Sequence, residues 1–362
     1  MPKNYTVTLP HYSVGPSCYD ELGQVTRFYG RTAAVVGGET ALAKAGPALK
    51  AGFEKAGVKL TEWTVYGKDS TNANVEKIVN NPKVQEADLL FGVGGGRAID
   101  TVRTAADILG KPFFSVPPVS AIAVIYKDDG ALDHYHFPKR CPEHCFIDTT
   151  VILDSPEELF WAGIGDALSK QAESQLASRG AELTHTPLLG VQVGLVCEDP
   201  LLEYGKQAIE DFRAKRDSHA FTETVLDIIV STGITSNLTT TKDSYYYNSS
   251  LAHCFYNASM VLPSIHKHLH GEVVSFGTLV LHAVDEDDVA LERLMTFNHS
   301  VGLPVTLAQL DITTPEQVNA LVDRAATMKE WTCVPYEMTK DKFRNGIYKV
   351  DELGRKFVAK QS

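Results

Sequence analysis

The chain has 362 residues, of which 44% are hydrophobic and 22% are charged, as in an ordinary globular protein. Its formal net charge of −11 argues against nucleic acid or an anionic membrane as the main partner, because both require a basic surface. No apolar run approaches the roughly 20 residues of a transmembrane helix, and the N-terminal residues lack the apolar centre of a signal peptide, so we expect a cytoplasmic protein.

The first half of the chain alternates strand and helix patterns. Buried strands are predicted at 32–36, 58–65, 87–93 and 113–116, with helices at 40–56, 74–79 and 97–109. Repeated β-α-β units indicate a doubly wound parallel sheet. We therefore expect an α/β nucleotide-binding domain over residues 1–154.

The second half reads as helical throughout. Helices are predicted at 157–179, 187–196, 201–214, 220–234, 251–262 and from 272 onward. This pattern indicates an all-α domain over residues 155–362. We expect a cleft between the two domains, where ligands usually bind.

Three consecutive glycines, Gly94, Gly95 and Gly96, stand between a predicted strand and a predicted helix. Glycine lets the backbone approach a phosphate, and a helix N-terminus favours anions, so the pattern indicates a pyrophosphate site. A tight strand-to-helix turn is the structural alternative. Gly38 follows the first strand, where dinucleotide folds often place an acid against the adenosine ribose, so a 2′-phosphate would find room there.

The six cysteines are scattered along the chain, so we expect reduced thiols and no disulfide framework. Cys141 and Cys145 lack the second ligand pair that a structural zinc site needs.

Four of the twelve histidines fall within residues 251–276: His253, His266, His268 and His270. His253 and His270 lie on either side of a helix break at Pro263, so they could converge on one ion with Asp166. Such a set suits catalytic zinc or ferrous iron, because it leaves a coordination position open. Taken alone, Asp166 is explained more simply as a cap near a helix start, and a lone histidine is more often structural than a ligand.

Several motifs taken together resemble the glycerol dehydrogenase branch of the iron-containing (group III) alcohol dehydrogenases over nearly the whole chain. The motifs are Gly94-Gly-Gly-Arg-Ala-Ile-Asp100, Ser120–Tyr126, Ala162–Leu168, His253, and His270-Gly-Glu before Phe276–Val280. The resemblance implies a dehydroquinate-synthase-like fold with NAD or NADP in the cleft and one divalent metal, zinc before iron, on Asp166, His253 and His270.

The resemblance also assigns residues to the cofactor. Gly95, Gly96 and Arg97 would meet the pyrophosphate, and Ser120, Ile122 and Tyr126 would line the nicotinamide side. Gly38, Gly94 and Asp100 are also expected to bind the cofactor. His266 would lie close to the metal without binding it, and we expect His268 to be solvated.

Four positions depart from the family pattern. Arg97 replaces a lysine, Gly38 an acid, and Tyr256 a second histidine. Val116-Pro117 runs directly into Pro118, where the family has a longer Thr/Ser-rich loop with a substrate-facing acid; a true deletion and missing residues both stay open. The pattern also resembles a sub-branch that acts on 2-oxo and 2-hydroxy carboxylic acids with NADP(H).

We therefore predict a metal-dependent oxidoreductase that transfers hydride between NAD(P)H and a small carbonyl compound, with a glycerol-type polyol or a 2-hydroxy carboxylic acid as the alcohol. His266 or a water on the metal would carry the proton, and we expect a homo-oligomer. One alternative is a dehydroquinate synthase-like lyase, disfavoured by the scarcity of Lys and Arg around the metal motifs. A catalytically weakened metal- or dinucleotide-binding homologue is the other, suggested by the short Pro117–Pro118 junction.

Overall fold

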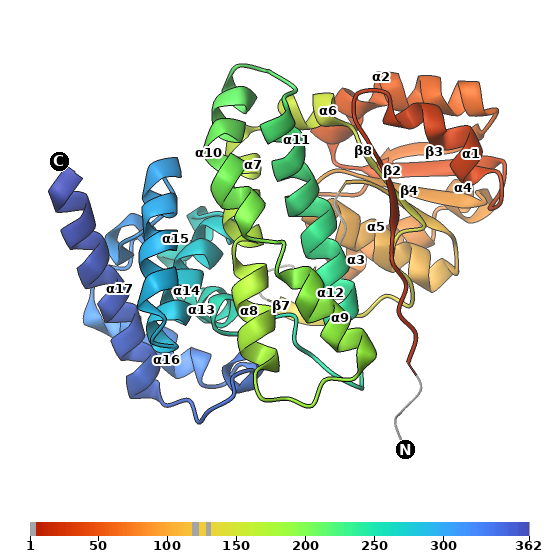
Figure 1. Ribbon diagram of the computed structural model, residues 1–362. Helices are drawn as coiled ribbons and strands as arrows, with labels where there is room; N and C mark the ends of the chain where they lie inside the picture. The colour runs from red at the N-terminus through yellow and green to blue at the C-terminus, as the bar shows by residue number, and fades with distance from the viewer. Residues whose placement is uncertain (1–4, 118–122, 128–131, 362) are drawn as a thin grey trace. The chain divides into compact units, whose positions relative to one another are not determined.

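The computed structural model describes residues 5–117, 123–127 and 132–361 (Figure 1). The chain divides into two compact units, Met1–Ser155 and Pro156–Ser362. The boundary predicted from the sequence, between residues 154 and 155, lies one residue earlier.

The first unit is built on a six-stranded parallel sheet with the order β1-β8-β5-β4-β2-β3. Its strands are β1 (His11–Val14), β2 (Thr32–Gly37), β3 (Lys59–Val65), β4 (Leu89–Val93), β5 (Phe113–Val116) and β8 (His144–Ile147). The helices are α1 (Leu22–Thr26), α2 (Glu39–Ala56), α3 (Asn72–Val79), α4 (Pro82–Glu86), α5 (Gly96–Leu109) and α6 (Thr149–Leu153). Strands β1 and β8 of the sheet were not predicted, and neither was the hairpin of β6 (Ala123–Tyr126) and β7 (Leu132–His136).

Side chains alternate between the two faces of this sheet, as the two-residue period of a strand requires. Val35 and Phe91 belong to the core beneath α2, whereas Val36 and Leu90 belong to the core beneath α3 and α5. Figure 1 shows these helices on opposite faces of the sheet. Both faces are therefore buried, which explains the continuous apolar runs of these strands.

Within the described residues, the second unit consists of helices and connecting loops, with one isolated bridge between Thr240 and Tyr246. Its helices are α7 (Glu157–Ala167), α8 (Ser169–Ser178), α9 (His185–Gly194), α10 (Asp199–Arg213), α11 (His219–Leu226), α12 (Thr232–Thr239), α13 (Leu251–Ser259), α14 (His270–Val284), α15 (Asp288–Val301), α16 (Pro315–Ala325) and α17 (Lys340–Gln361). The predicted combination of a doubly wound parallel sheet with an all-α part is confirmed.

The helix predicted over 157–179 is interrupted at Leu168, which separates α7 from α8. The Ser169 hydroxyl donates to the Asp166 carbonyl at 2.8 Å, so a side chain competes with the backbone for this acceptor. The helix predicted over 220–234 is likewise not uniform. A π-helical segment, Asp227–Ser231, joins α11 to α12.

Helix α14 runs through the core of the second unit. Every residue from Val273 to Val284 is buried, and the helix packs against α7, α8, α13, α15 and α17. Its first residue, His270, is exposed, so this otherwise buried helix meets solvent at its N-terminus.

All six cysteines are free thiols, as predicted. No helix in the described part of the chain is both long and apolar enough to cross a bilayer.

Candidate metal centre

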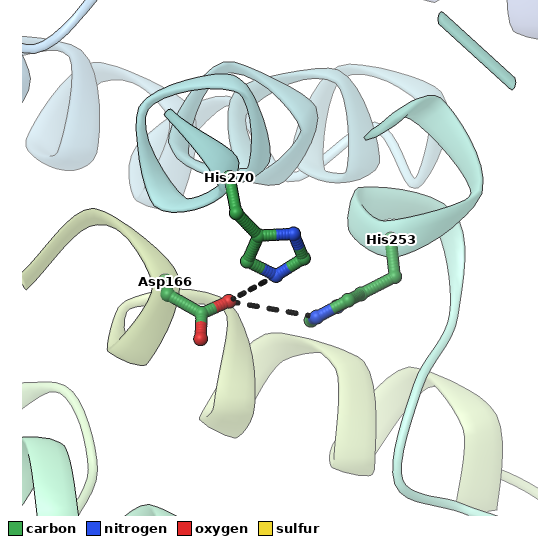
Figure 2. A group of neighbouring side chains, drawn as sticks. All are labelled: Asp166, His253 and His270. Carbon is green, nitrogen blue, oxygen red and sulfur yellow. Dashed lines mark ion pairs between the residues drawn. The ribbon is translucent and has the colours of Figure 1, made fainter. Parts of the chain in front are cut away.

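Three side chains from three helices of the second unit meet at one point (Figure 2). Asp166 lies near the end of α7, His253 in the first turn of α13, and His270 at the first residue of α14. The Asp166 Oδ1 atom lies 3.1 Å from His270 Nε2 and 3.5 Å from His253 Nε2. The three ligand atoms lie within 4.8 Å of one another, and no other such group of His, Cys, Asp or Glu occurs among the described residues.

Two glycines make this convergence possible. A Cβ atom on Gly271 would lie 1.8 Å from the Ala162 carbonyl oxygen, and one on Gly165 would lie 2.5 Å from the Gly271 carbonyl oxygen. Only residues without a side chain let α7 and α14 approach so closely. The glycines beside Asp166 and His270 therefore bring these two residues together.

The interpretation of Asp166 as a cap at a helix start was wrong. Asp166 is the last residue but one of α7, where the helix dipole does not favour a negative charge. Its carboxylate is held by the two histidines instead.

The charges around the three side chains favour a cation. Although 45% of the Asp166 side chain is exposed, its Oδ1 atom is buried and makes no hydrogen bond of normal geometry. Burial opposes the charge of the carboxylate, but His270 and His253 outweigh it and hold the pKa of Asp166 well below its usual range. Burial likewise opposes a charged His253, but Glu173 and Asp166 raise the pKa of this imidazole to about 10. A divalent ion would displace that proton.

The donor set fits a divalent metal. Two imidazole nitrogens and one carboxylate oxygen, converging around a buried and otherwise unsatisfied oxygen, are the ligands of catalytic zinc and non-haem iron sites. Cys141 and Cys145 are buried and belong to no such group among the described residues.

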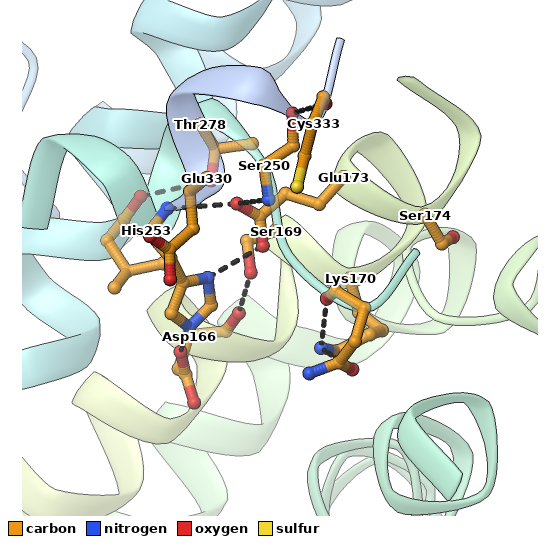
Figure 3. A network of polar contacts seen from close by, with 12 residues as sticks. Asp166, Ser169, Lys170, Glu173, Ser174, Ser250, His253, Thr278, Glu330 and Cys333 are labelled. Carbon is orange, nitrogen blue, oxygen red and sulfur yellow. Dashed lines mark hydrogen bonds and ion pairs between the residues drawn. The ribbon is translucent and has the colours of Figure 1, made fainter. Parts of the chain in front are cut away.

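Glu173, which the sequence did not single out, supports the centre from α8 (Figure 3). Its side chain is fully buried, and its Oε2 atom lies 2.6 Å from His253 Nδ1. One signal was available: Glu173 lies seven positions after Asp166, so two helical turns place both residues on one face if the helix continues.

The other two histidines of residues 251–276, His266 and His268, do not belong to this group. His266 is exposed in the 3-10 turn Pro263–Lys267, and its Nε2 lies 3.1 Å from the Met260 carbonyl oxygen. Its role as proton carrier stays a prediction. The expectation that His268 is solvated is wrong, because only 10% of its side chain is exposed and its nitrogens lie 2.9 Å from Glu272 Oε1 and 2.8 Å from Asp311 Oδ2.

The three glycines after β4 have different roles. Gly94 has a φ of +139°, so the turn itself requires glycine there. Gly95 is the N-cap of α5 with an ordinary φ of −78°, and Cβ atoms on Gly95 or Gly96 would meet nothing within 4 Å. The fold does not demand these two glycines, and no side chain caps the helix. The N–H groups of this first helical turn and the open space at Gly95 and Gly96 fit a phosphate group.

Gly38 lies beside this turn, since its N–H donates to the carbonyl of Val93 at 3.0 Å. Its φ of −72° is ordinary, and a Cβ atom would have Tyr66 Cε1 as its nearest neighbour at 3.9 Å. Glycine is therefore not required by the backbone, and a Cβ atom would make only ordinary van der Waals contacts there.

The remaining predicted cofactor residues that the structure describes, Arg97, Asp100 and Tyr126, interact with neighbouring side chains and backbone. Arg97 forms an ion pair with Asp69, and its guanidinium lies 5.6 Å from the centroid of the Tyr126 ring. Asp100 accepts the Val124 N–H at 3.0 Å, and burial raises the pKa of Asp100 to about 7. Ser120, Ile122 and the Pro118 side of the short junction lie outside the described residues.

Comparison with known proteins places the chain among dehydrogenases. Residues 13–156 match the family model "Iron-containing alcohol dehydrogenase". The chain is 27% identical over 362 residues to a glycerol dehydrogenase of Escherichia coli O6:H1, with 96% of each chain covered. It is 30% identical over 279 residues to hydroxycarboxylate dehydrogenase A of Escherichia coli strain K12, covering 74% of this chain and 76% of that protein.

A similar solved structure is the glycerol dehydrogenase of Schizosaccharomyces pombe. It matches with a TM-score of 0.85 at 22% identity and covers 100% of this chain and 93% of that one. This structural match shows the fold. The sequence matches confirm the predicted class of enzyme, a metal-dependent, NAD-linked oxidoreductase that acts on CH–OH groups. The chain belongs to the iron-containing alcohol dehydrogenase family.

Proposed function

We propose that this enzyme interconverts a glycerol-type polyol or a 2-hydroxy carboxylic acid and the matching ketone, with Zn²⁺ bound by Asp166, His253 and His270. The observation that carries the proposal is the convergence of these three donors within 4.8 Å. Three protein ligands are typical of catalytic zinc, which keeps a coordination position open for substrate. The same set also suits ferrous iron, so metal analysis is part of the test.

The names of the relatives suggest the two substrate classes. One relative is a glycerol dehydrogenase and another a hydroxycarboxylate dehydrogenase. Glycerol and 2-hydroxy acids both carry oxygen atoms on adjacent carbons, so either could present two oxygens to one cation. Such substrates need an accessible centre, and the Asp166 and His270 side chains are 45% and 44% exposed.

We further propose that the enzyme accepts NADP(H) as well as NAD(H). The N-terminus of α5 at Gly95 and Gly96 would receive the pyrophosphate, because its first N–H groups point away from the helix and no atom lies within 4 Å of a Cβ at either glycine. Gly38 itself brings no carboxylate that would repel a 2′-phosphate, and a Cβ atom there would make only ordinary van der Waals contacts.

The bound metal would act as a Lewis acid on the substrate oxygen, while the dinucleotide exchanges a hydride with the substrate carbon. The chain itself holds and orients the groups involved. Asp166 stays ionised because of its depressed pKa and so remains an oxygen ligand. The Tyr256 ring packs edge-to-face on His270, with centroids 4.2 Å apart, and limits rotation of that imidazole.

Metal analysis followed by a substrate panel tests the proposal. Glycerol, diols and 2-oxo acids are assayed with both NAD(H) and NADP(H), before and after EDTA treatment and Zn²⁺ re-addition. We expect one metal ion per chain, loss of turnover with EDTA, and recovery with Zn²⁺.

Substitution of a ligand separates metal binding from general damage. His270→Ala should lose the metal and lower turnover by more than about 100-fold, since replacing even outer partners of a metal ligand costs 10- to 100-fold. The control is His219→Ala, which removes a histidine that is 73% exposed and should retain metal and activity. Full activity in a verified metal-free preparation would refute the proposal.

Homo-oligomeric assembly and a cytoplasmic location complete the proposal, on the grounds of the sequence alone. Gel filtration with light scattering tests the first, and fractionation of the source cells tests the second.

A further inference from the structure

The carboxylate of Glu173 makes three hydrogen bonds to one short stretch of chain (Figure 3). Its Oε1 accepts the backbone N–H groups of Ser250 at 2.7 Å and His253 at 2.9 Å, and its Oε2 accepts from the His253 ring at 2.6 Å. The side chain is 0% exposed. A buried carboxylate is costly unless it is fully hydrogen-bonded, and these bonds meet that need.

Two of these bonds complete the start of α13. Ser250 is the N-cap residue of α13, but its hydroxyl donates to the Cys333 carbonyl at 2.6 Å instead of capping the helix. The first N–H groups of a helix need acceptors, and a negative charge is favoured at this end. Glu173 supplies both from a different helix, α8.

The third bond acts on the metal ligand itself. Because a carboxylate only accepts, the Nδ1 atom of His253 must carry a hydrogen, so in the neutral ring the lone pair is on Nε2. Nε2 is the atom that faces Asp166, at 3.5 Å. The same carboxylate therefore fixes both the backbone and the ring of His253.

A second side chain of α8 holds the segment that leads into α13. The Lys170 ammonium donates to the carbonyl and the side-chain oxygen of Asn248 at 3.0 Å and 2.9 Å. Lys170 and Glu173 lie one turn apart on α8, so this helix binds both the segment before α13 and the first turn of α13.

We propose that Glu173 is the positioning residue of the metal centre: it selects the His253 tautomer that directs the Nε2 lone pair toward the ion. The inference rests on the proposed metal site. It concerns metal affinity as well as catalysis, so metal binding can test it directly.

Glu173→Gln separates the two tasks of the carboxylate. The amide oxygen can still accept the two backbone N–H groups, which keeps the start of α13 intact. The amide NH₂ then meets Nδ1 as a donor and favours the tautomer with a hydrogen on Nε2, where the ion would bind. The reversed amide would set its NH₂ against two N–H groups and is disfavoured.

We measure Zn²⁺ affinity by chelator competition, the Co²⁺ absorption spectrum, and thermal unfolding of the metal-free protein. Glu173→Gln should bind Zn²⁺ 10- to 100-fold more weakly, as for other outer partners of ligand histidines. The metal-free variant should also unfold at a lower temperature, because it loses the buried ion pair with His253. Glu330→Gln is the matched control, because Glu330 is a buried carboxylate of the same network, 4% exposed, that accepts from Asn257 at 3.3 Å. It should keep wild-type affinity.

Equal Zn²⁺ affinity of wild type and Glu173→Gln would overturn this inference alone. Equal losses in Glu173→Gln and Glu330→Gln would also overturn it, because the effect would then come from charge and not from the hydrogen bond to His253. A wild type that binds no metal would overturn the proposed function and this inference together. If Glu173→Gln does not fold, histidine ¹⁵N spectra of the Zn²⁺-loaded wild type decide: a hydrogen on His253 Nδ1 supports the inference, and a metal on that atom refutes it.

Discussion

Replacement of Gly271 by alanine should separate two of the metal donors. A Cβ atom at this position would lie 1.8 Å from the Ala162 carbonyl oxygen, whereas close carbon–oxygen contacts in proteins are about 3.3 Å or longer. The start of α14 would therefore have to move from α7 by roughly 1.5 Å, the difference between these distances. Metal–ligand distances tolerate only about 0.2 Å. Because His270 directly precedes Gly271, its Nε2 should leave the position that it shares with Asp166.

We expect Gly271→Ala to lose tight Zn²⁺ binding and to unfold with about 1–3 kcal/mol less stability, a typical cost of overpacking. Chelator competition measures the first and chemical denaturation of the metal-free protein the second. Gly163→Ala on α7 is the matched control, since its Cβ would meet Ile228 Cγ2 at an ordinary 3.4 Å. Wild-type Zn²⁺ affinity in Gly271→Ala would show that the glycine contact does not set the donor geometry.

Two further substitutions address the buried Asp227 and the cofactor. Burial, opposed only weakly by the Ser231 hydroxyl, raises the pKa of Asp227 from 3.8 to about 7. The folded chain thus keeps a proton that the unfolded chain loses, so the free energy of unfolding should fall by up to about 4 kcal/mol between pH 4 and 7. Asp227→Asn should lack this loss. Equal pH slopes of the wild type and the variant in chemical denaturation would contradict the prediction. Gly38→Asp fits the backbone and places a negative charge at the proposed 2′-phosphate site, so the Kd for NADP(H) should rise at least about 10-fold relative to NAD(H). An unchanged cofactor preference would count against that site.

The parallel sheet was predictable because its signals are local. The strand 87–93 and the glycines after it form one continuous pattern, and both faces of the sheet are buried, so apolar runs mark the strands directly. The break between α7 and α8 was not predictable in this way. Leu168 keeps helical backbone angles, so the break is a small local change that no hydrophobic periodicity records.

The candidate site was predictable only in part, for a related reason. His253 and His270 stand out because histidine is rare and their motifs resemble a known family. Glu173 does not, because its role arises from the contact between α8 and α13. His268 was misjudged because one of its two carboxylate partners, Asp311, lies far away along the chain.

The burial of α14 ties the metal centre to the stability of the whole second unit. His270 is the first residue of a helix that is packed on all sides, so it cannot shift by local fraying at little cost. Release of the ion on heating should therefore coincide with cooperative melting of the helices around α14. Metal retention would then report the integrity of the entire helical half of the enzyme.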